Sequence, residues 1–264
     1  MRTFNSLLNS GFAVISQFII LIFAFLTRTV FIRILGSEYL GFDTLFTSIL
    51  GILSIADLGL GTALNFSLYA PIRKNDVEKT AAILQYFKKI FFWLGILLFL
   101  LAFCIVPFLD LLVAGSTNSI PYMQKVFILY AILTFSSYFF TDVRTVYHAH
   151  QQNYKVLVFD FLAKIFTKSL QIVLLLSYPS YLWYLVIEII ITLFFNVRLM
   201  RKAHKEYPDF YDHASTLSAQ DRKVIFNDVK VLSLSKIANV GINGTDSVII
   251  SKFVGTAEIG RAHV

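Results

Sequence analysis

The chain has 264 residues, of which 57% are hydrophobic and 15% are charged, and its mean hydropathy is +0.70. Ordinary soluble chains are about 45–50% apolar and about 25% charged, so this composition excludes a typical soluble domain and indicates an integral membrane protein. The net charge of +7 is typical of basic residues beside membrane spans, so we expect no nucleic-acid partner, and the single Cys104 excludes an intramolecular disulfide.

Successive apolar stretches are each long enough to cross a bilayer as a helix of roughly 20 residues. We place helices at 11–34, 40–69, 81–109, 122–147, 156–178, 180–200 and 228–253. The first run has no small-residue cleavage site and predicts a retained signal anchor. Runs such as FFWLGILLFLLAFCIVPFL lack the polar alternation of barrel strands. The predicted fold class is an all-α polytopic membrane protein with one six-helix bundle plus a seventh helix.

Lys and Arg gather in alternate connections between the predicted helices. They are dense between the second and third helices, flank the connection between the fourth and fifth, and are dense again between the sixth and seventh. The connection SYPSY, between the fifth and sixth helices, has none. Because cytoplasmic connections carry the excess of Lys and Arg, we expect a multi-pass protein of the cytoplasmic membrane with a cytoplasmic N-terminus.

Two glycines, Gly59 and Gly61, lie in the motif GLGTAL, which resembles a nucleotide-binding glycine turn. The dinucleotide fingerprint requires a third glycine where this chain has Leu64, and it requires a preceding strand. Glycine inside a membrane helix more often permits close packing or a bend. We therefore interpret Gly59 and Gly61 as a hinge or packing point, beside an Asp57 that faces a cavity.

Charged side chains inside the predicted spans are costly, at about 2.5–3.5 kcal/mol near the bilayer centre, and so usually face a cavity or a partner. The charged residues of this kind are Arg28, Arg33, Asp57, Asp142, Arg144, Asp160, Lys164, Lys168, Glu188 and Asp246. Those near span ends, Arg33, Arg144 and Lys168, can alternatively extend to the headgroups. The deeper Arg28, Asp57 and Glu188 favour a buried functional or pairing role.

The helix at 156–178 has the clearest polar stripe. Asp160, Lys164, Lys168 and Gln171 fall on one face of a 3.6-residue helix, and the first two have the i, i+4 spacing of an ion pair. This stripe predicts a hydrated interior. If Arg28, Lys164 and Lys168 face the same cavity, that cavity is cationic and suits a phosphate or pyrophosphate group.

Enzyme motifs are not evident in the sequence. It shows no Ser/His/Asp grouping, no metal-spaced His or Cys cluster and no Walker motif. His148 and His150 stand two positions apart and would not face each other on a helix. We expect no enzymatic activity, no metal and no cofactor.

Three separated blocks resemble bacterial polysaccharide-export flippases of the Wzx type, which belong to the multidrug/oligosaccharidyl-lipid/polysaccharide exporter superfamily. The blocks are TRTVFIRILGSEYLGFDTLFTSILGILSIADLGLGTALNFSLYAPIRKND, TDVRTVYHAHQQNY and KIANVGINGTDSVIISKFVGTAE. The resemblance implies two helical bundles around a central cavity. This chain would then be the N-terminal half of a two-bundle transporter: a bundle at 1–200, a cytoplasmic linker at 201–227, and the first helix of an incomplete second bundle at 228–258.

The resemblance implies that the protein flips polyprenyl-pyrophosphate-linked oligosaccharide repeats for O-antigen, capsule, teichoic-acid-like or exopolysaccharide assembly. Its partners would be that glycan, membrane lipids, and a polysaccharide polymerase with glycosyltransferases. Arg28, Lys164 and Lys168 would contact the pyrophosphate, and Asp57 and Asp160 would be ion-pair or coupling-ion groups. The last residues, IGRAHV at 259–264, match the translation of a widely used sequencing adapter, which predicts a non-native tail on a truncated reading frame.

Three alternatives to a flippase remain open. A multidrug or organic-cation antiporter of the same superfamily would need an anionic cavity. A membrane-embedded glycan polymerase would need a large outer loop, and the predicted outer connections are short. A scaffold that transports nothing would leave the charges inside the spans unexplained.

Overall fold

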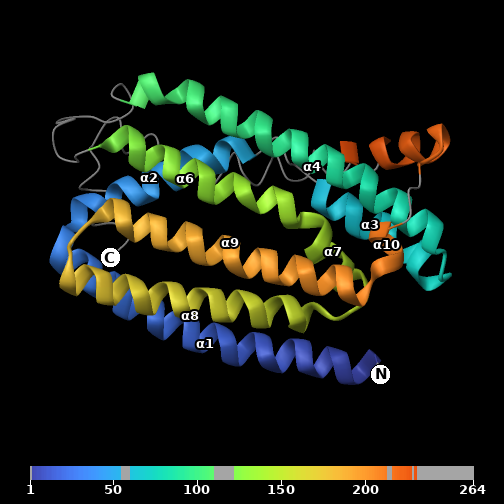
Figure 1. Cartoon of the computed structure of the whole chain (residues 1–264), viewed down its shortest axis with the longest axis horizontal. Coiled ribbons are helices and arrows are strands. Elements are labelled where there is room, and N and C mark those ends of the chain that lie inside the picture. The colour runs from blue at the N-terminus through green and yellow to red at the C-terminus, as the bar shows by residue number, and fades with distance from the viewer. Residues whose placement is uncertain (1, 55–59, 110–121, 213–215, 228, 231–264) are drawn as a thin grey trace.

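The computed structural model describes residues 2–54, 60–109, 122–212, 216–227 and 229–230, with side chains from residue 11 onward (Figure 1). Asp57, Gly59, Asp246, nearly all of the predicted helix at 228–253 and the tail at 259–264 lie outside the described residues. The helices are α1 (Arg2–Leu35), α2 (Ser37–Leu53), α3 (Leu60–Arg73), α4 (Val77–Ile105), α6 (Met123–Ser136), α7 (Thr141–Ala149), α8 (Asn153–Ser177), α9 (Tyr181–Glu206) and α10 (Pro208–Asp212), with 3₁₀ turns η2 (Val106–Phe108) and η3 (Ser137–Phe140).

The long helices lie side by side, and the chain reverses direction from one membrane-length segment to the next (Figure 1). α8 packs between α1 and α9, α6 packs against α9 and α4, and α3 packs against α4 and α7. The predicted second span contains α2 and α3, with residues 55–59 between them outside the described residues, and the predicted fourth span divides into α6, η3 and α7. α9 runs to Glu206 and α10 follows it, so part of the predicted linker at 201–227 is helical.

Local sequence signals set several of these helix ends. Gly36 has a φ of 99°, in the left-handed region that favours glycine, and so permits the turn between α1 and α2. Asp76 caps α4, where its carboxylate accepts a hydrogen bond of 2.9 Å from the Lys79 backbone N–H. Ser180 caps α9 in the same way. Pro71 stands inside α3, which ends two residues later.

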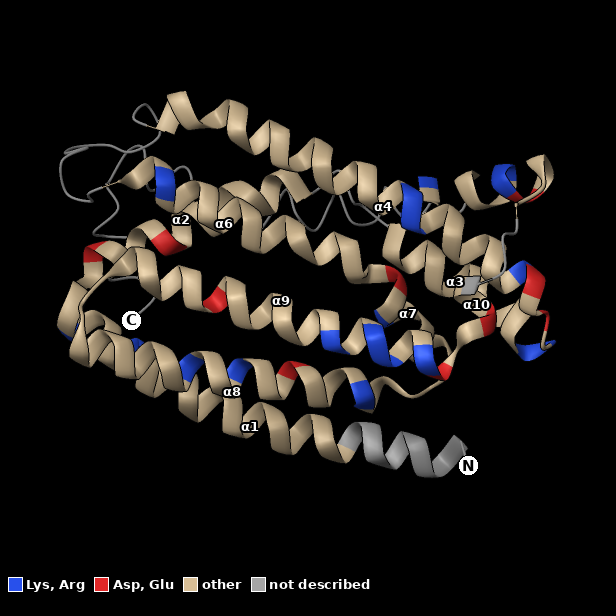
Figure 2. Cartoon of the chain, viewed as in Figure 1, with Lys and Arg blue, Asp and Glu red and all other residues tan. Residues whose placement is uncertain are grey.

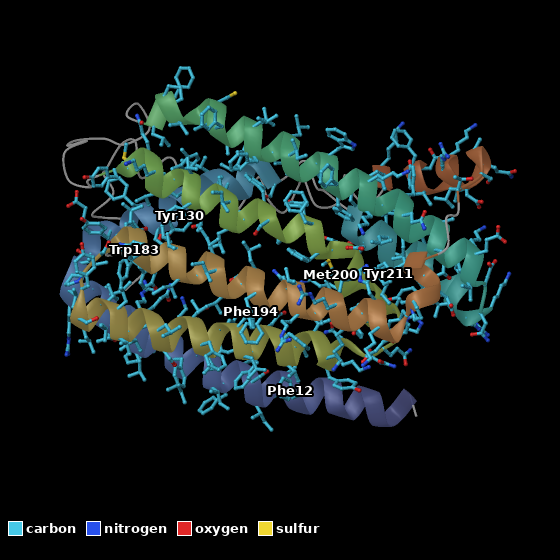
Figure 3. All side chains as sticks on the ribbon, viewed as in Figure 1. Phe12, Tyr130, Trp183, Phe194, Met200 and Tyr211 are labelled. Carbon is cyan, nitrogen blue, oxygen red and sulfur yellow. The ribbon has the colours of Figure 1, made fainter. Side chains whose placement is uncertain are left out.

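The outer faces of the helices are apolar and the interior is aromatic. Phe46, Phe87 and Phe127 are completely buried between the helices. By contrast, Phe18 is more than half exposed, and so are Trp183 and Phe194, which are labelled in Figure 3. Within the described residues, four segments are long and apolar enough to cross a membrane: Gly11–Leu35, Val77–Phe108, Met123–Ala149 and Tyr181–Glu206. The chain is therefore an all-α polytopic membrane protein, as predicted.

Most of the described Lys and Arg residues gather at one end of the molecule (Figure 2). That end holds the connections from α3 to α4, from α7 to α8 and from α9 to α10 (Figure 1), the alternate arrangement that the sequence predicted. We call it the basic end. Its location in the cytoplasm stays a prediction.

Ion pairs join the connections at the basic end. Lys155 and Glu206 approach to 2.7 Å, and Lys79 and Asp221 to 2.8 Å. The hydrogen bond from Lys79 lowers the pKa of Asp221. Burial raises the pKa of Tyr207 to about 12.

Candidate functional site

A cavity of about 310 Å³ lies among α1, α2, α6, α8 and α9. We call it the first cavity. Apolar, hydroxyl and charged side chains line it together: Ala24, Thr27, Arg28, Phe31, Leu40, Asp43, Thr47, Tyr130, Leu133, Thr134, Lys168, Tyr184 and Glu188. A polar cavity enclosed by apolar helices is the usual form of a ligand site in a membrane protein.

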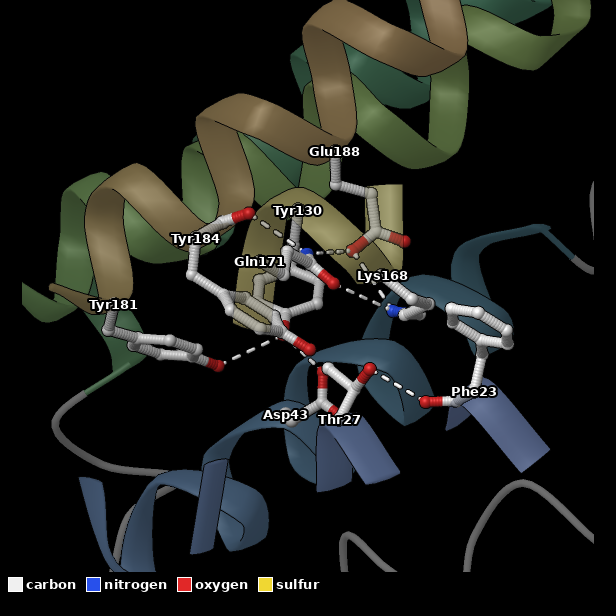
Figure 4. A network of polar contacts seen from close by, with 9 residues as sticks. All are labelled: Phe23, Thr27, Asp43, Tyr130, Lys168, Gln171, Tyr181, Tyr184 and Glu188. Atoms are coloured by element: carbon white, nitrogen blue, oxygen red, sulfur yellow. Dashed lines mark hydrogen bonds and ion pairs between the residues drawn. The ribbon is translucent and has the colours of Figure 1, made fainter. Parts of the chain in front are cut away.

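One wall of the first cavity is a chain of hydroxyl groups that ends on a carboxylate (Figure 4). The Tyr130 hydroxyl donates a hydrogen bond to Asp43, and the hydroxyls of Tyr130 and Tyr181 lie 2.9 Å apart. Both tyrosines are buried. Because the Tyr130 proton points to Asp43, Tyr181 donates to Tyr130, and the chain links α2, α6 and α9.

A second set of polar side chains joins α8 and α9 beside the first cavity (Figure 4). Lys168 Nζ donates to Gln171 Oε1 at 3.0 Å, and Gln171 Nε2 donates to Glu188 Oε2 and to the Tyr184 carbonyl, each at 3.0 Å. Lys168 Nζ also lies 3.8 Å from Glu188 Oε2. Gln171 is completely buried, so its amide holds the two charged side chains in position.

The described lining of the first cavity is formally neutral. Two cations, Arg28 and Lys168, are balanced by two carboxylates, Asp43 and Glu188. The sequence led us to expect a cationic cavity that included Lys164. Lys164 is exposed and is not part of the lining, and Asp43 lines the cavity although no sequence argument had selected it.

A second cavity of about 290 Å³ lies among α3, α7 and α8, closer to the basic end along α8. Its lining consists of Gly61, Asn65, Thr141, Arg144, Thr145, His148, Asn153, Val156, Leu157 and Asp160. The Arg144 guanidinium donates to both oxygens of Asp160, at 2.8 and 2.7 Å, and to Asn196 Oδ1 at 2.8 Å. Asp160 therefore pairs with Arg144 and not with Lys164, the partner expected from i, i+4 spacing.

Of the two glycines interpreted as a hinge or packing point, the structure describes Gly61. A Cβ atom added to Gly61 would meet no described atom beyond its own helix backbone within 4 Å, and the hinge or packing role stays a prediction. Close packing occurs at Gly95, where an added Cβ would lie 3.3 Å from Tyr138 Cβ. A bend beside Gly59 stays a prediction.

Sequence reasoning missed Asp43, Tyr130 and Tyr184 in the lining of the first cavity, and also Tyr181, which bonds to Tyr130 from outside that lining. Asp43 lies in the predicted span at 40–69, so the rule that selected Asp57 could also have found it. The tyrosines carry no such signal, because tyrosine is common at membrane interfaces. Among the described residues, no cluster of His, Cys, Asp and Glu could hold a metal ion.

Comparison with known proteins yields one structural similarity. No protein-family model matches the chain, and no curated protein matches it. The chain is similar to a solved structure described as the inward-facing conformation of a multidrug resistance MATE family transporter of the MOP superfamily. The TM-score is 0.53 with 18% identity, over 90% of this chain and 55% of that one. The chain therefore spans about half of that protein's length and shares the fold of that part of it.

Proposed function

We propose that this chain belongs to a membrane transporter that moves a polyprenyl-pyrophosphate-linked oligosaccharide across the cytoplasmic membrane. The observation that carries the proposal is the first cavity, where Arg28 and Lys168 stand beside carboxylates and hydroxyl groups inside an apolar bundle. The fold, shared with part of a transporter, favours transport over enzymatic chemistry.

The lining of the first cavity offers groups for both polar parts of this substrate, the pyrophosphate and the sugars. Arg28 and Lys168 are suited to phosphate oxygens, because guanidinium and ammonium groups make strong charge-assisted hydrogen bonds with them. The carboxylates of Asp43 and Glu188 and the hydroxyls of Thr47 and Tyr130 are suited to sugar hydroxyls, which both donate and accept hydrogen bonds. The polyprenyl chain of the substrate would lie in the bilayer, against the apolar outer faces of the helices.

The test is surface glycan export in cells that depend on this protein. Replacement of Arg28 or Lys168 by Gln removes a charged hydrogen-bond donor, worth about 1.5–3 kcal/mol of binding. We expect strongly reduced surface polysaccharide at unchanged protein level. Arg198→Gln is the control, because Arg198 is exposed, stacks over the Phe194 ring and lines neither cavity. Normal export in both Arg28→Gln and Lys168→Gln cells would overturn the proposal.

An organic-cation antiporter is the second candidate, and the carboxylates of Asp43 and Glu188 in the first cavity favour it. Ethidium efflux separates the two functions. The flippase proposal predicts that Asp43→Asn and Glu188→Gln leave the ethidium resistance of the cells unchanged. Loss of ethidium efflux in these variants, with normal glycan export, would favour the antiporter.

A further inference from the structure

Two paired charged groups line the second cavity, and a third, unpaired one lies outside that lining, one helical turn farther along α8. Arg144 on α7 and Asp160 on α8 form the bidentate pair, with side chains 34% and 35% exposed. Lys164 is exposed and makes no hydrogen bond or ion pair with any other described residue. The three charges sum to +1, so the group attracts an anion.

Asp160 has a second partner within reach. Lys164 follows it by four residues on α8, a rise of about 6 Å, and an acid placed N-terminal to a lysine at this spacing is the favourable order for an ion pair. Asp160 can therefore leave Arg144 without becoming an unpaired carboxylate.

From this arrangement we propose that the second cavity is a pyrophosphate site that works by an exchange of ion pairs. This inference rests on the proposed function and adds a second binding site for the pyrophosphate group of the substrate, closer to the basic end than the first cavity. In the ligand-free protein, Arg144 is bound to Asp160 and Lys164 is unpaired. A pyrophosphate group takes the Arg144 guanidinium, which forms two parallel hydrogen bonds with phosphate as readily as with carboxylate. The Asp160 carboxylate then forms an ion pair with Lys164.

The remaining lining supports an anion in this position. Asn65, Thr141, Thr145 and Asn153 place amide and hydroxyl groups around the cavity. The side-chain oxygen of Asn65 is buried and has no hydrogen-bond partner in the described part of the chain. Because the two ends of an amide are interchangeable by rotation, Asn65 can offer its NH₂ group to a phosphate oxygen.

The test is a double-mutant cycle on pyrophosphate binding. Inorganic pyrophosphate is titrated calorimetrically into purified protein that carries Arg28→Gln and Lys168→Gln, which removes the cations of the first cavity. In this background, Arg144→Gln should weaken binding by about tenfold or more, and Lys164→Met should weaken it several-fold. Asp160→Asn should not weaken binding, because it frees Arg144.

The decisive comparison is the loss of pyrophosphate affinity caused by Lys164→Met in protein with Asp160 and in protein with Asp160→Asn. Ion-pair exchange predicts that most of the loss caused by Lys164→Met disappears once Asp160 is neutral, because Lys164 then no longer has to accept Asp160 and contributes only its charge. An equal loss in both backgrounds would mean that Lys164 touches the ligand directly and would overturn the exchange. This comparison leaves Arg144 intact, so it stands even if Arg144→Gln misfolds.

A second titration identifies the source of the pyrophosphate group. A polyprenyl pyrophosphate in nanodiscs should show the same pattern of variants as the inorganic ion, and a pattern confined to the inorganic ion would overturn the lipid headgroup as the ligand. Wild-type binding that disappears completely with Arg28→Gln and Lys168→Gln would overturn the second site and leave the proposed function intact. Glycan export is measured separately from pyrophosphate binding. Normal export in both Arg28→Gln and Lys168→Gln cells would overturn the proposed function, whereas the binding results at the second cavity would still stand.

Discussion

Replacement of Arg144 by Gln tests whether its hydrogen bonds hold α7, α8 and α9 together. The substitution removes two charge-assisted hydrogen bonds to Asp160 and one to Asn196. Buried charged hydrogen bonds contribute about 1.5–3 kcal/mol, and exposed ion pairs about 0.2–1 kcal/mol. Because these side chains are about one-third exposed, we expect a loss of about 2 kcal/mol. That loss corresponds to a decrease in melting temperature of roughly 4–8 °C for a chain of this size.

The assay is retention of the monodisperse size-exclusion peak in detergent after heating. Lys164→Met is the matched control, since Lys164 lies one turn from Asp160, is exposed and has no partner among the described residues. It should change stability by less than about 0.5 kcal/mol. Equal melting temperatures for Arg144→Gln and Lys164→Met would refute the structural role assigned to Arg144.

Three further predictions concern packing, buried polarity and pH. Gly95→Leu should destabilise the protein by about 1–3 kcal/mol in the same heating assay, because the new side chain meets Tyr138. Gln171→Leu should cost about 1–3 kcal/mol, because it leaves three polar partners without their hydrogen bonds. The lowered pKa of Asp221 means that its bond to Lys79 persists above the ordinary value of 3.8 and weakens as pH falls below it. Hydrogen exchange at 216–227 should therefore rise only in strong acid, and Asp221→Asn should abolish that change.

The helices were largely predictable because long apolar runs in the sequence indicate membrane-spanning helices directly. The runs that form α1, α4 and α9 are apolar over more than the bilayer thickness, and caps such as Asp76 and Ser180 mark where helices begin. The 3₁₀ turn η3 inside the fourth span was not predicted, and it packs against α4 with Tyr138 and Phe140 buried.

The partners of the charged residues were less predictable. Helical spacing suggested a pair between Asp160 and Lys164, but Arg144 offers two parallel hydrogen bonds across the α7–α8 contact and forms the pair in the structure. Such a contact depends on how helices meet, which periodicity does not encode. In the same way, Glu188 was identified as a deep charge, while its contacts with Gln171 and Lys168 emerge only from the packing of α8 on α9.

The most direct test of the central claim is transport by purified protein. The measurement is the translocation of a fluorescent polyprenyl-pyrophosphate-linked oligosaccharide across proteoliposomes that contain wild-type protein, Arg28→Gln/Lys168→Gln protein or Arg198→Gln protein. The account predicts translocation by the wild type and by Arg198→Gln, and a rate near that of empty liposomes for the double variant. Equal rates for all three proteins would contradict the assignment of the first cavity as the substrate site.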